Sequence, residues 1–348
     1  MLTERRLKTL LAAFSDLRIG VVGDFFLDAY YDCNPALDEK SLETGKTCYQ
    51  VVRTRRQAGA AGTVAANLKA LGVGHVDAVG FCGDDGEGYE LRRAMGALGL
   101  DLTHFFCRSD RSTPTYGKPC YVDAARRNLP VTEELERLDI KNRRPTPAAL
   151  QEEIIACACD NVDRWDGVVL LDQVGEANCG VLTGRVRRAL LDQLRQRPDK
   201  IALADSRERI HLFKYTMIKP NQFEAVQVLG GGRRKPSLKA SMHHARALVK
   251  KTHRPVFVTL GAQGMLVADN HQVHRAPGFP IAGPVDPVGA GDSTSAAIVA
   301  AMAAGADQME AAHIANLAGS ITTRQIGTTG TASPAQIRRR HREVSRGL

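Results

Sequence analysis

The sequence is poor in aromatic residues and has no long apolar run. Phe, Trp and Tyr make up 5% of its 348 residues, and Trp occurs once. No apolar stretch approaches the roughly 18 residues that a membrane-spanning helix needs, so a membrane protein is not expected. The basic N-terminal stretch 1–18 contains Glu4 and Asp16 and has no small-residue cleavage site. It predicts an amphipathic helix rather than a secretory signal peptide.

The sequence also lacks the spacings that bind zinc. Its eight cysteines are mostly single, and the closest two, Cys157 and Cys159, lie in a stretch that is typical of a helix end. No CxxC pair and no cluster of His and Cys occurs, so a zinc site is not expected. We expect buried free thiols in a cytoplasmic protein, because the cytoplasm keeps thiols reduced.

The net charge of +9 includes short basic runs at 53–56, 233–235 and 338–342. A nucleic-acid-binding protein combines such runs with an aromatic platform or a known module, and neither is present here. We therefore expect no nucleic-acid partner, and the basic balance suits a phosphorylated small molecule. No G-x-G-x-x-G fingerprint follows the first expected strand, which argues against a dehydrogenase.

Short apolar runs alternate with helical patterns along most of the chain. Strands are expected at 17–24, 75–83, 166–172, 200–205, 215–221 and 255–261. Helices are expected at 61–71, 88–98, 146–163, 180–196, 238–252, 290–304 and 308–323. A parallel sheet that is covered on both faces requires apolar strands separated by helices, so the sequence predicts an α/β protein.

Two segments interrupt this alternation. Residues 28–57 and 103–125 carry short polar strands and turns, which predict a small β lid over the carboxyl ends of the sheet. The charged, irregular segment 124–147 is expected to be an exposed loop. Because no repeat and no linker is visible, residues 1–348 are expected to form a single domain that includes this lid.

The stretch VGAGD at 288–292 combines a flexible turn with a carboxylate. Gly289 and Gly291 permit backbone geometries in which successive amides converge, and a helix beginning at Ala290 adds its positive end. Asp292 stands beside this anion-binding turn and can accept a proton. Such a pair suits phosphoryl transfer to a hydroxyl. The residues alone equally allow an ordinary glycine turn with an Asp at the helix start.

Six short motifs follow one another along the chain. They are GDFFLD (23–28), GAAGTVAANLKALG (59–72), KPNQFE (219–224), TLGAQG (259–264), DPVGAGD (286–292) and AHIANLAG (312–319). In this order they resemble the ribokinase-like, PfkB-type carbohydrate kinases, whose late signature is D-T-x-G-A-G-D. The resemblance covers almost all of the chain. It implies a three-layer α/β/α sandwich with a mostly parallel central sheet and a small β lid.

The resemblance also implies a catalytic centre. Asp292 would take the proton of a sugar hydroxyl, while the amides of Gly289, Ala290 and Gly291 hold the transferring phosphoryl group. The cofactors implied are ATP and Mg²⁺. A monovalent cation such as K⁺ would lie near Asp286.

The matching positions imply two binding sites beside that centre. The nucleotide-site residues would be Asn221, Glu224, Thr259, Gly261, Gly264 and Asn316. Of these, Asn221 and Glu224 would organise Mg²⁺ through water, as suits a hard cation that bridges phosphate oxygens. The sugar-site residues would be Asp28, Gly59, Thr63 and Asn67.

The segments 35–52 and 134–139 are similar to the corresponding regions of heptose-7-phosphate kinases. The sugar site nevertheless departs from that pattern. Ala60 stands where a second Gly is expected, and Thr63 replaces an Asn that contacts the sugar. The loop 173–176 reads Gln-Val-Gly-Glu in place of a loop with Tyr and Lys, which removes a phosphate partner. Arg207 offers a cation nearby, but the sequence does not give its direction.

These observations predict an ATP- and Mg²⁺-dependent carbohydrate kinase whose acceptor is a sugar or sugar phosphate. Two alternatives stay open: a non-catalytic sugar or nucleotide sensor on the same fold, and a kinase for a nucleoside or another small alcohol. By resemblance, a homodimer would form through the lid. The sequence gives neither the acceptor nor the hydroxyl that is phosphorylated.

Overall fold

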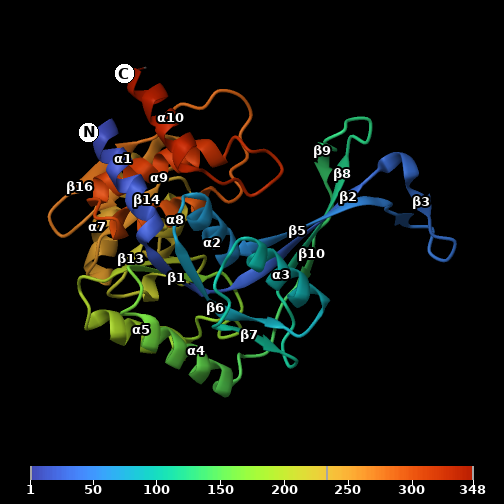
Figure 1. Cartoon of the computed structure of the whole chain (residues 1–348), viewed down its shortest axis with the longest axis horizontal. Helices are drawn as coiled ribbons and strands as arrows, with labels where there is room; N and C mark the ends of the chain where they lie inside the picture. The colour runs from blue at the N-terminus through green and yellow to red at the C-terminus, as the bar shows by residue number, and fades with distance from the viewer. Residues whose placement is uncertain (1, 233, 347–348) are drawn as a thin grey trace.

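A nine-stranded sheet lies at the centre of the structure, a computed structural model that describes residues 2–232 and 234–346 (Figure 1). Across the sheet, its strands are ordered β16 (Val273–Pro277), β15 (Gly264–Ala268), β14 (Val256–Thr259), β13 (Met217–Ile218), β12 (Ile201–Ser206), β11 (Gly167–Asp172), β1 (Arg18–Gly23), β6 (His75–Gly83) and β7 (Phe105–Arg108). Neighbouring strands are parallel from β14 to β7. The pairs β14–β15 and β15–β16 are antiparallel.

Side chains of the central strands alternate between two apolar cores. In β1, Ile19 and Val21 enter one core and Val22 enters the other, as the two-residue period of a strand requires. The helices on the first core are α1 (Glu4–Ala13), α2 (Ala61–Ala70), α3 (Gly86–Ala97), α8 (Ala290–Ala303), α9 (Gln308–Thr322) and α10 (Pro334–Arg346). Those on the second are α4 (Ala148–Asn161), α5 (Gly184–Arg195), α6 (Gln222–Val228) and α7 (Leu238–Thr252). The predicted α/β architecture with both faces covered is confirmed.

The expected strands and helices appear within a few residues of their predicted bounds, and some elements were not expected. Unexpected elements include β7 as part of the central sheet, β15, β16, α6 and α10. In α10, the basic run 338–342 hides an amphipathic pattern in which Ile337 and His341 are buried against the protein. Short 3₁₀ turns complete the list: η1 (Phe14–Asp16), η2 (Pro35–Leu37), η3 (Ile210–Leu212) and η4 (Gly261–Gln263).

A second sheet projects from the central body as the predicted lid (Figure 1). Its strand order is β10 (Leu138–Ile140), β8 (Thr115–Val122), β2 (Phe25–Cys33) and β5 (Val51–Ala60), with β9 (Val131–Glu134) also paired to β8. A small hairpin of β3 (Glu39–Lys40) and β4 (Thr47–Cys48) lies at its outer end. Strand β2 follows β1 after the single residue Asp24, so the lid grows directly out of the central sheet.

The second lid segment differs from the prediction. Part of the expected segment 103–125 belongs to the central sheet, because Phe105–Arg108 pairs in parallel with β6. Phe105 packs there against Phe25, with ring centroids 5.2 Å apart, which fixes this stretch in the core rather than in the lid. The segment 124–147, expected to be a loop, contributes β9 and β10 instead. Because this segment has many charged residues, the alternation of apolar and polar residues around Leu138 and Ile140 was not recognised as a strand pattern.

In the part of the chain that the structure describes, every helix is too short or too polar to cross a membrane.

Candidate active site

The carboxyl ends of the parallel strands bring the predicted residues together. Parallel strands end at the same edge of a sheet, and ligands of such sheets bind outside that edge. Asp205 lies at the end of β12, Asn221 follows β13, and Thr259 ends β14. Thr259 is bridged to Asn221 in the parallel direction, so these motifs adjoin although they are distant in sequence.

The N-terminus of α8 forms the centre of the site. Gly289 caps this helix with φ +76°, a left-handed conformation that a glycine adopts without strain. The amide of Ala290 donates to Pro287 O at 3.1 Å. Among the described residues, the amides of Gly289 and Gly291 have no main-chain acceptor. These two amides and the positive helix end are therefore available to an anion.

One cavity opens on the side of α8 that faces β14 and α9. Its volume is about 460 Å³, and we call it the nucleotide cavity after the predicted nucleotide-site residues that line it. The predicted nucleotide residues Thr259, Gly261, Gly264 and Asn316 line it, together with Ala290 and Gly291. Most of its remaining lining is apolar or small, which suits the flat face of a base and leaves room for main-chain contacts to phosphates.

A second cavity, of about 400 Å³, opens between α8 and the lid. Asp28, Thr63, Asp286, Gly289 and Asp292 line it. We call it the acceptor cavity. The first residues of α8 thus separate the two cavities, with Ala290 and Gly291 facing one and Asp292 facing the other.

Asp292 has an electrostatic environment suited to a base. Burial and the nearby carboxylate of Asp205 raise the pKa of Asp292 to about 7, against the opposing charges of Lys219 and Arg207. A carboxyl group with a pKa near neutrality can accept a proton and release it again at the pH of the cell.

Lys219 is a site residue that the sequence reasoning quoted but did not assign. Its Nζ lies 2.9 Å from Asp205 Oδ2, and the side chain is buried. Burial acts to lower the pKa of Lys219, but the charge and hydrogen bond of Asp205 outweigh it and raise that pKa, so the amine stays charged. A Cβ added to Gly291 would lie 3.6 Å from Nζ, which places the cation beside the anion-binding turn. A lysine directly ahead of the Asn-x-x-Glu motif was the signal in the sequence.

Asp28 lies in the lid strand β2 and pairs with a second unassigned lysine. Lys118 Nζ is 2.9 Å from Asp28 Oδ1 and also donates to the hydroxyl of Tyr30 at 3.3 Å. The neighbouring strand makes room for the carboxylate, because a Cβ at Gly59 would lie 2.7 Å from Asp28 Oδ2. Gly59 therefore shapes the acceptor cavity without lining it.

Asn221 and Glu224 form a capping box at the start of α6. The Asn221 side chain accepts hydrogen bonds from the amides of Phe223 and Glu224, and Glu224 Oε2 accepts one from the Asn221 amide at 2.8 Å. Burial raises the pKa of Glu224. No group of three or more His, Cys, Asp or Glu in the described ranges could hold a metal ion directly. This donor set suits a cation that phosphates bind directly and that the protein contacts through water. It suits direct coordination by protein side chains less well.

Asp286 ties the loop before α8 to the loop after α9. Its carboxylate accepts hydrogen bonds from the amides of Val288 and Gly327, both at 3.0 Å. Its own amide donates to Thr323 O at 2.8 Å. The Asp286 carboxylate thus lies beside the acceptor cavity, and carboxylate oxygens are usual ligands of hard cations.

Asn67 is not brought to either cavity. Its side chain donates to Thr63 O at 2.9 Å inside α2, where it is fully buried. Asn316 does line the nucleotide cavity, and its amide group donates to the carbonyls of Ala276 and Pro277.

The loop after β11 completes the wall of the acceptor cavity. Arg207 Nε donates to Gln173 Oε1 at 2.9 Å, and both side chains line the cavity with Asp292. The direction of Arg207, which the sequence could not give, is therefore toward the site. The buried carboxylate of Asp24 holds this loop by accepting hydrogen bonds from the amides of Gln173, Val174 and Val181 at 2.7–3.0 Å.

Comparison with known proteins agrees with this arrangement. A family model described as pfkB family carbohydrate kinase matches residues 25–336. The chain is 29% identical over 340 residues to a bifunctional protein HldE of Geobacter metallireducens, covering 96% of this chain and 64% of that protein. It is 30% identical over 339 residues to a bifunctional protein HldE of Caulobacter vibrioides, covering 93% and 65%. The chain thus spans about two thirds of the length of these relatives.

Two solved structures share the fold. The chain superposes on Arabidopsis thaliana ribokinase complexed with ribose and ATP with a TM-score of 0.68 and 17% identity, over 93% of this chain and 98% of that one. For phosphofructokinase-2 from Escherichia coli, in complex with substrates and products, the TM-score is 0.70 at 17% identity, over 94% and 99%. The ribokinase-like fold that the motifs implied is therefore confirmed.

Proposed function

Because the chain belongs to the pfkB family of carbohydrate kinases, we propose that it transfers the γ-phosphoryl group of ATP to a hydroxyl of a sugar or sugar phosphate at the N-terminus of α8. One observation carries the proposal. Asp292 faces the acceptor cavity, while Ala290 and Gly291, immediately before it, face the nucleotide cavity. A hydroxyl beside Asp292 and a γ-phosphate beside Gly291 would meet at the start of this helix.

The proposed step is an in-line displacement. The acceptor oxygen attacks the γ-phosphorus while the bond from that phosphorus to the β,γ-bridging oxygen breaks, and ADP leaves with that electron pair. The proton of the attacking hydroxyl passes to Asp292. The amides of Gly289 and Gly291 and the ammonium of Lys219 offset the negative charge on the phosphoryl oxygens.

Cations complete the proposed nucleotide site. Glu224 and Asn221 would hold Mg²⁺ through water, and that ion would neutralise charge on the bridged phosphates. Glu224 Oε1 takes no part in the capping box, which supports an outer-sphere role. A monovalent cation such as K⁺ would bind beside Asp286, whose carboxylate connects the two loops.

The acceptor would be held by the lid and α2. Asp28 offers a carboxylate that is fixed by Lys118, and Thr63 supplies a buried hydroxyl. The similarity of 35–52 and 134–139 to heptose-7-phosphate kinases supports an acceptor that resembles a heptose phosphate. We extend to this chain only the kinase activity and not any second activity of the longer relatives.

The proposal treats residues 1–348 as one kinase unit that acts in the cytoplasm and pairs through its lid. The free cysteines agree with a reducing compartment. The lid exposes large apolar side chains at Leu42, Val51, Val52 and Leu138, which support a contact between two copies.

The decisive test is Asp292→Asn, which removes the proton acceptor and keeps the side-chain size. We expect kcat to fall by at least about 100-fold with any sugar that the wild type phosphorylates, while ATP binding is retained. Asp192→Asn, an exposed change in α5, is the matched control and should leave kcat unchanged. Activity that survives in the Asp292 variant would refute the assigned base. Sugar binding without any phosphorylated product in the wild type would favour a sensor.

A further inference from the structure

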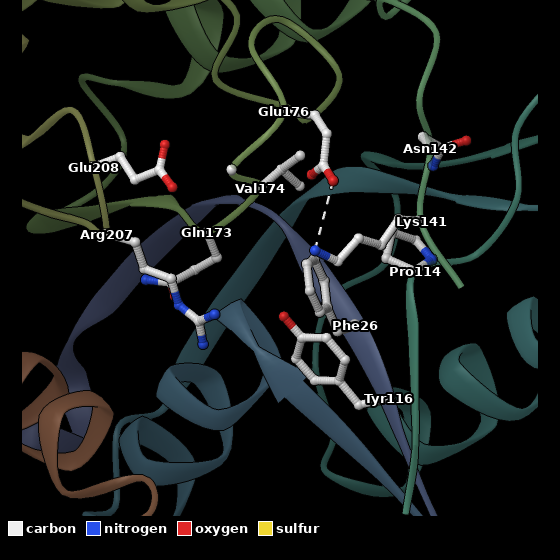
Figure 2. A pocket seen from close by; sticks show the side chains of 11 residues that line it. Phe26, Pro114, Tyr116, Lys141, Asn142, Gln173, Val174, Glu176, Arg207 and Glu208 are labelled. Atoms are coloured by element: carbon white, nitrogen blue, oxygen red, sulfur yellow. Dashed lines mark hydrogen bonds and ion pairs between the residues drawn. The ribbon is translucent and has the colours of Figure 1, made fainter. Parts of the chain in front are cut away.

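A smaller cavity continues from the acceptor cavity on the side of the loop after β11 (Figure 2). We call it the tail pocket and define it by Phe26, Tyr116, Lys141, Gln173, Glu176 and Arg207. Phe26, Tyr116, Gln173 and Arg207 line both cavities, so the two are continuous. Asp292 lines only the acceptor cavity. A molecule with its reacting hydroxyl at Asp292 would extend its far end into the tail pocket.

The tail pocket has rigid walls. Asp24 fixes the amides of Gln173 and Val174, and Arg209 donates to Gly175 O at 3.0 Å while it pairs with Asp172 at 2.7 Å. On the opposite wall, Phe26 and Tyr116 pack edge to face with ring centroids 5.0 Å apart. A site whose walls are held in place loses little conformational entropy when a ligand binds.

The pocket contains a buried acceptor atom without a donor. Glu176 Oε1 lies 3.5 Å from Lys141 Nζ, as the dashed line in Figure 2 shows. Glu176 Oε2 is buried and has no hydrogen-bond partner among the described residues. An unpaired buried oxygen of a carboxylate costs free energy, and a ligand that donates a hydrogen bond would recover it.

Donors lie across the same pocket. Arg207 Nε donates a hydrogen bond to Gln173 Oε1. The two terminal nitrogens of Arg207 have no hydrogen bond to the described residues. The Tyr116 hydroxyl points toward the centre of the cavity and likewise has no hydrogen bond to a described side chain or carbonyl (Figure 2). The pocket therefore presents donors and an acceptor together, around the apolar ring of Phe26.

This combination distinguishes between two kinds of ligand. A hydroxyl both donates and accepts, so it can satisfy Glu176 and Arg207 in turn. Lys141 and Arg207 would attract an ionised phosphate, but Glu176 and Glu208 would repel it. Because a phosphate only accepts, it would also leave Glu176 Oε2 without a donor. The volume of about 120 Å³ holds roughly four water-sized groups, enough for a short carbon chain that bears hydroxyls.

We propose that the tail pocket binds an uncharged, hydroxyl-bearing carbon tail of the acceptor, at the end opposite the hydroxyl that is phosphorylated. The inference rests on the proposed kinase function. It selects, within the class of sugars and sugar phosphates, acceptors whose far end carries no phosphate. Glu176 is the residue that sets this preference.

The test compares sugars in matched pairs with and without a terminal phosphate. The probes are mannose and mannose 6-phosphate, fructose and fructose 6-phosphate, and sedoheptulose and sedoheptulose 7-phosphate. Phosphorylation in the presence of ATP is measured by mass spectrometry. Binding without ATP is measured separately as the shift in Tm. Within the best pair, we expect the free sugar to have a kcat/KM at least about tenfold above that of its phosphate.

Glu176→Gln removes the charge and keeps a carbonyl oxygen. We expect the ratio of kcat/KM for the free sugar to kcat/KM for its phosphate to fall about tenfold. The difference between the Tm shifts that the two ligands cause should become smaller as well. Glu152→Gln, an exposed change in α4 outside both cavities, is the control and should keep the preference. A Glu176→Lys variant should reverse it, because the cation would attract the phosphate.

The outcomes separate the two proposals. A wild type that prefers the terminal phosphates, or an unchanged ratio in Glu176→Gln, would overturn the tail-pocket inference. The same inference fails if none of the free sugars shifts Tm or gains a phosphate. If free sugars bind with a preference that depends on Glu176 but gain no phosphate, the inference holds and the kinase function fails.

Discussion

Gly59 in β5 leaves the space that the Asp28 carboxylate occupies in β2. A Cβ at position 59 would come within 2.7 Å of Asp28 Oδ2, closer than real contacts allow. Because Asp28 is also held by Lys118, the carboxylate cannot move without losing that pair. A glycine from one lid strand thus fixes an acid on the next strand that lines the acceptor cavity.

Gly59→Ala should therefore disturb acceptor binding and spare the nucleotide. We expect KM for the acceptor to rise about tenfold or more, with KM for ATP unchanged. Gly86→Ala is the control, because a Cβ there has no heavy atom within 4 Å. An equal rise in both Michaelis constants would show that the change acts through the whole fold instead.

The rate should rise with pH as Asp292 loses its proton. With a pKa of about 7, kcat/KM is expected to increase up to about pH 7 and then level off. Lys219 lowers the pKa of Asp292, so Lys219→Met should move the rising part of the pH–rate profile, its acid limb, to higher pH. Asp205 raises it, so Asp205→Asn should move the limb to lower pH. Initial rates across the pH range measure both shifts, and limbs that move in the same direction would contradict the assignment.

Asp292 should also lower the stability of the free protein. Its pKa in the folded state is raised above the usual 3.8, so the folded state holds the proton more tightly than the unfolded state does. The free-energy cost of ionising Asp292 in the folded protein is absent at pH values below about 4. This cost grows as the pH rises and reaches its full size above about pH 7. Asp292→Asn should thus raise Tm more at pH 8 than at pH 5, as calorimetry would show. A gain in Tm that does not change with pH would argue against the raised pKa.

Ala60 occupies a backbone conformation that favours glycine. Its φ of 51° and ψ of −116° match the first central position of a type II′ turn, which glycine normally fills. Ala60→Gly should relieve the strain and raise the free energy of unfolding by up to about 1 kcal/mol, part of the gain being offset by entropy of the unfolded chain. In the strand interior, Ala58→Gly should instead destabilise by about 1 kcal/mol. Urea unfolding of both variants checks the signs.

The resemblance implied two binding sites, and three of its motifs follow the parallel strands β1, β13 and β14, whose ends meet at one edge of the sheet. The structure brings Thr259, Asn316 and Gly291 to one cavity and Asp292 to the cavity beside it. The strands themselves were recognisable from apolar runs between turn residues. The resemblance supplied the order of the motifs, and the topology confirms the arrangement it implied.

The features that the sequence did not reveal depend on contacts between distant segments. Lys219 and Asp205 look like ordinary charged residues at strand ends until the fold places them 2.9 Å apart. Phe105 reads as part of a lid because nothing local shows that it packs on Phe25. The unpaired oxygen of Glu176 is likewise a property of burial by its neighbours, which no spacing in the sequence encodes.

Asp24 connects the lid to the central sheet through a very short and well hydrogen-bonded link. It is the single residue between β1 and β2, its amide donates to Leu171 O at 3.1 Å, and its carbonyl accepts from the Ala61 amide at 2.9 Å. Its carboxylate holds the loop that walls the acceptor cavity. Any rotation of the lid about this pivot must pull on the first turn of α2 and on that loop at once. The lid and the cavity wall are therefore coupled through Asp24, so a displacement of one would displace the other.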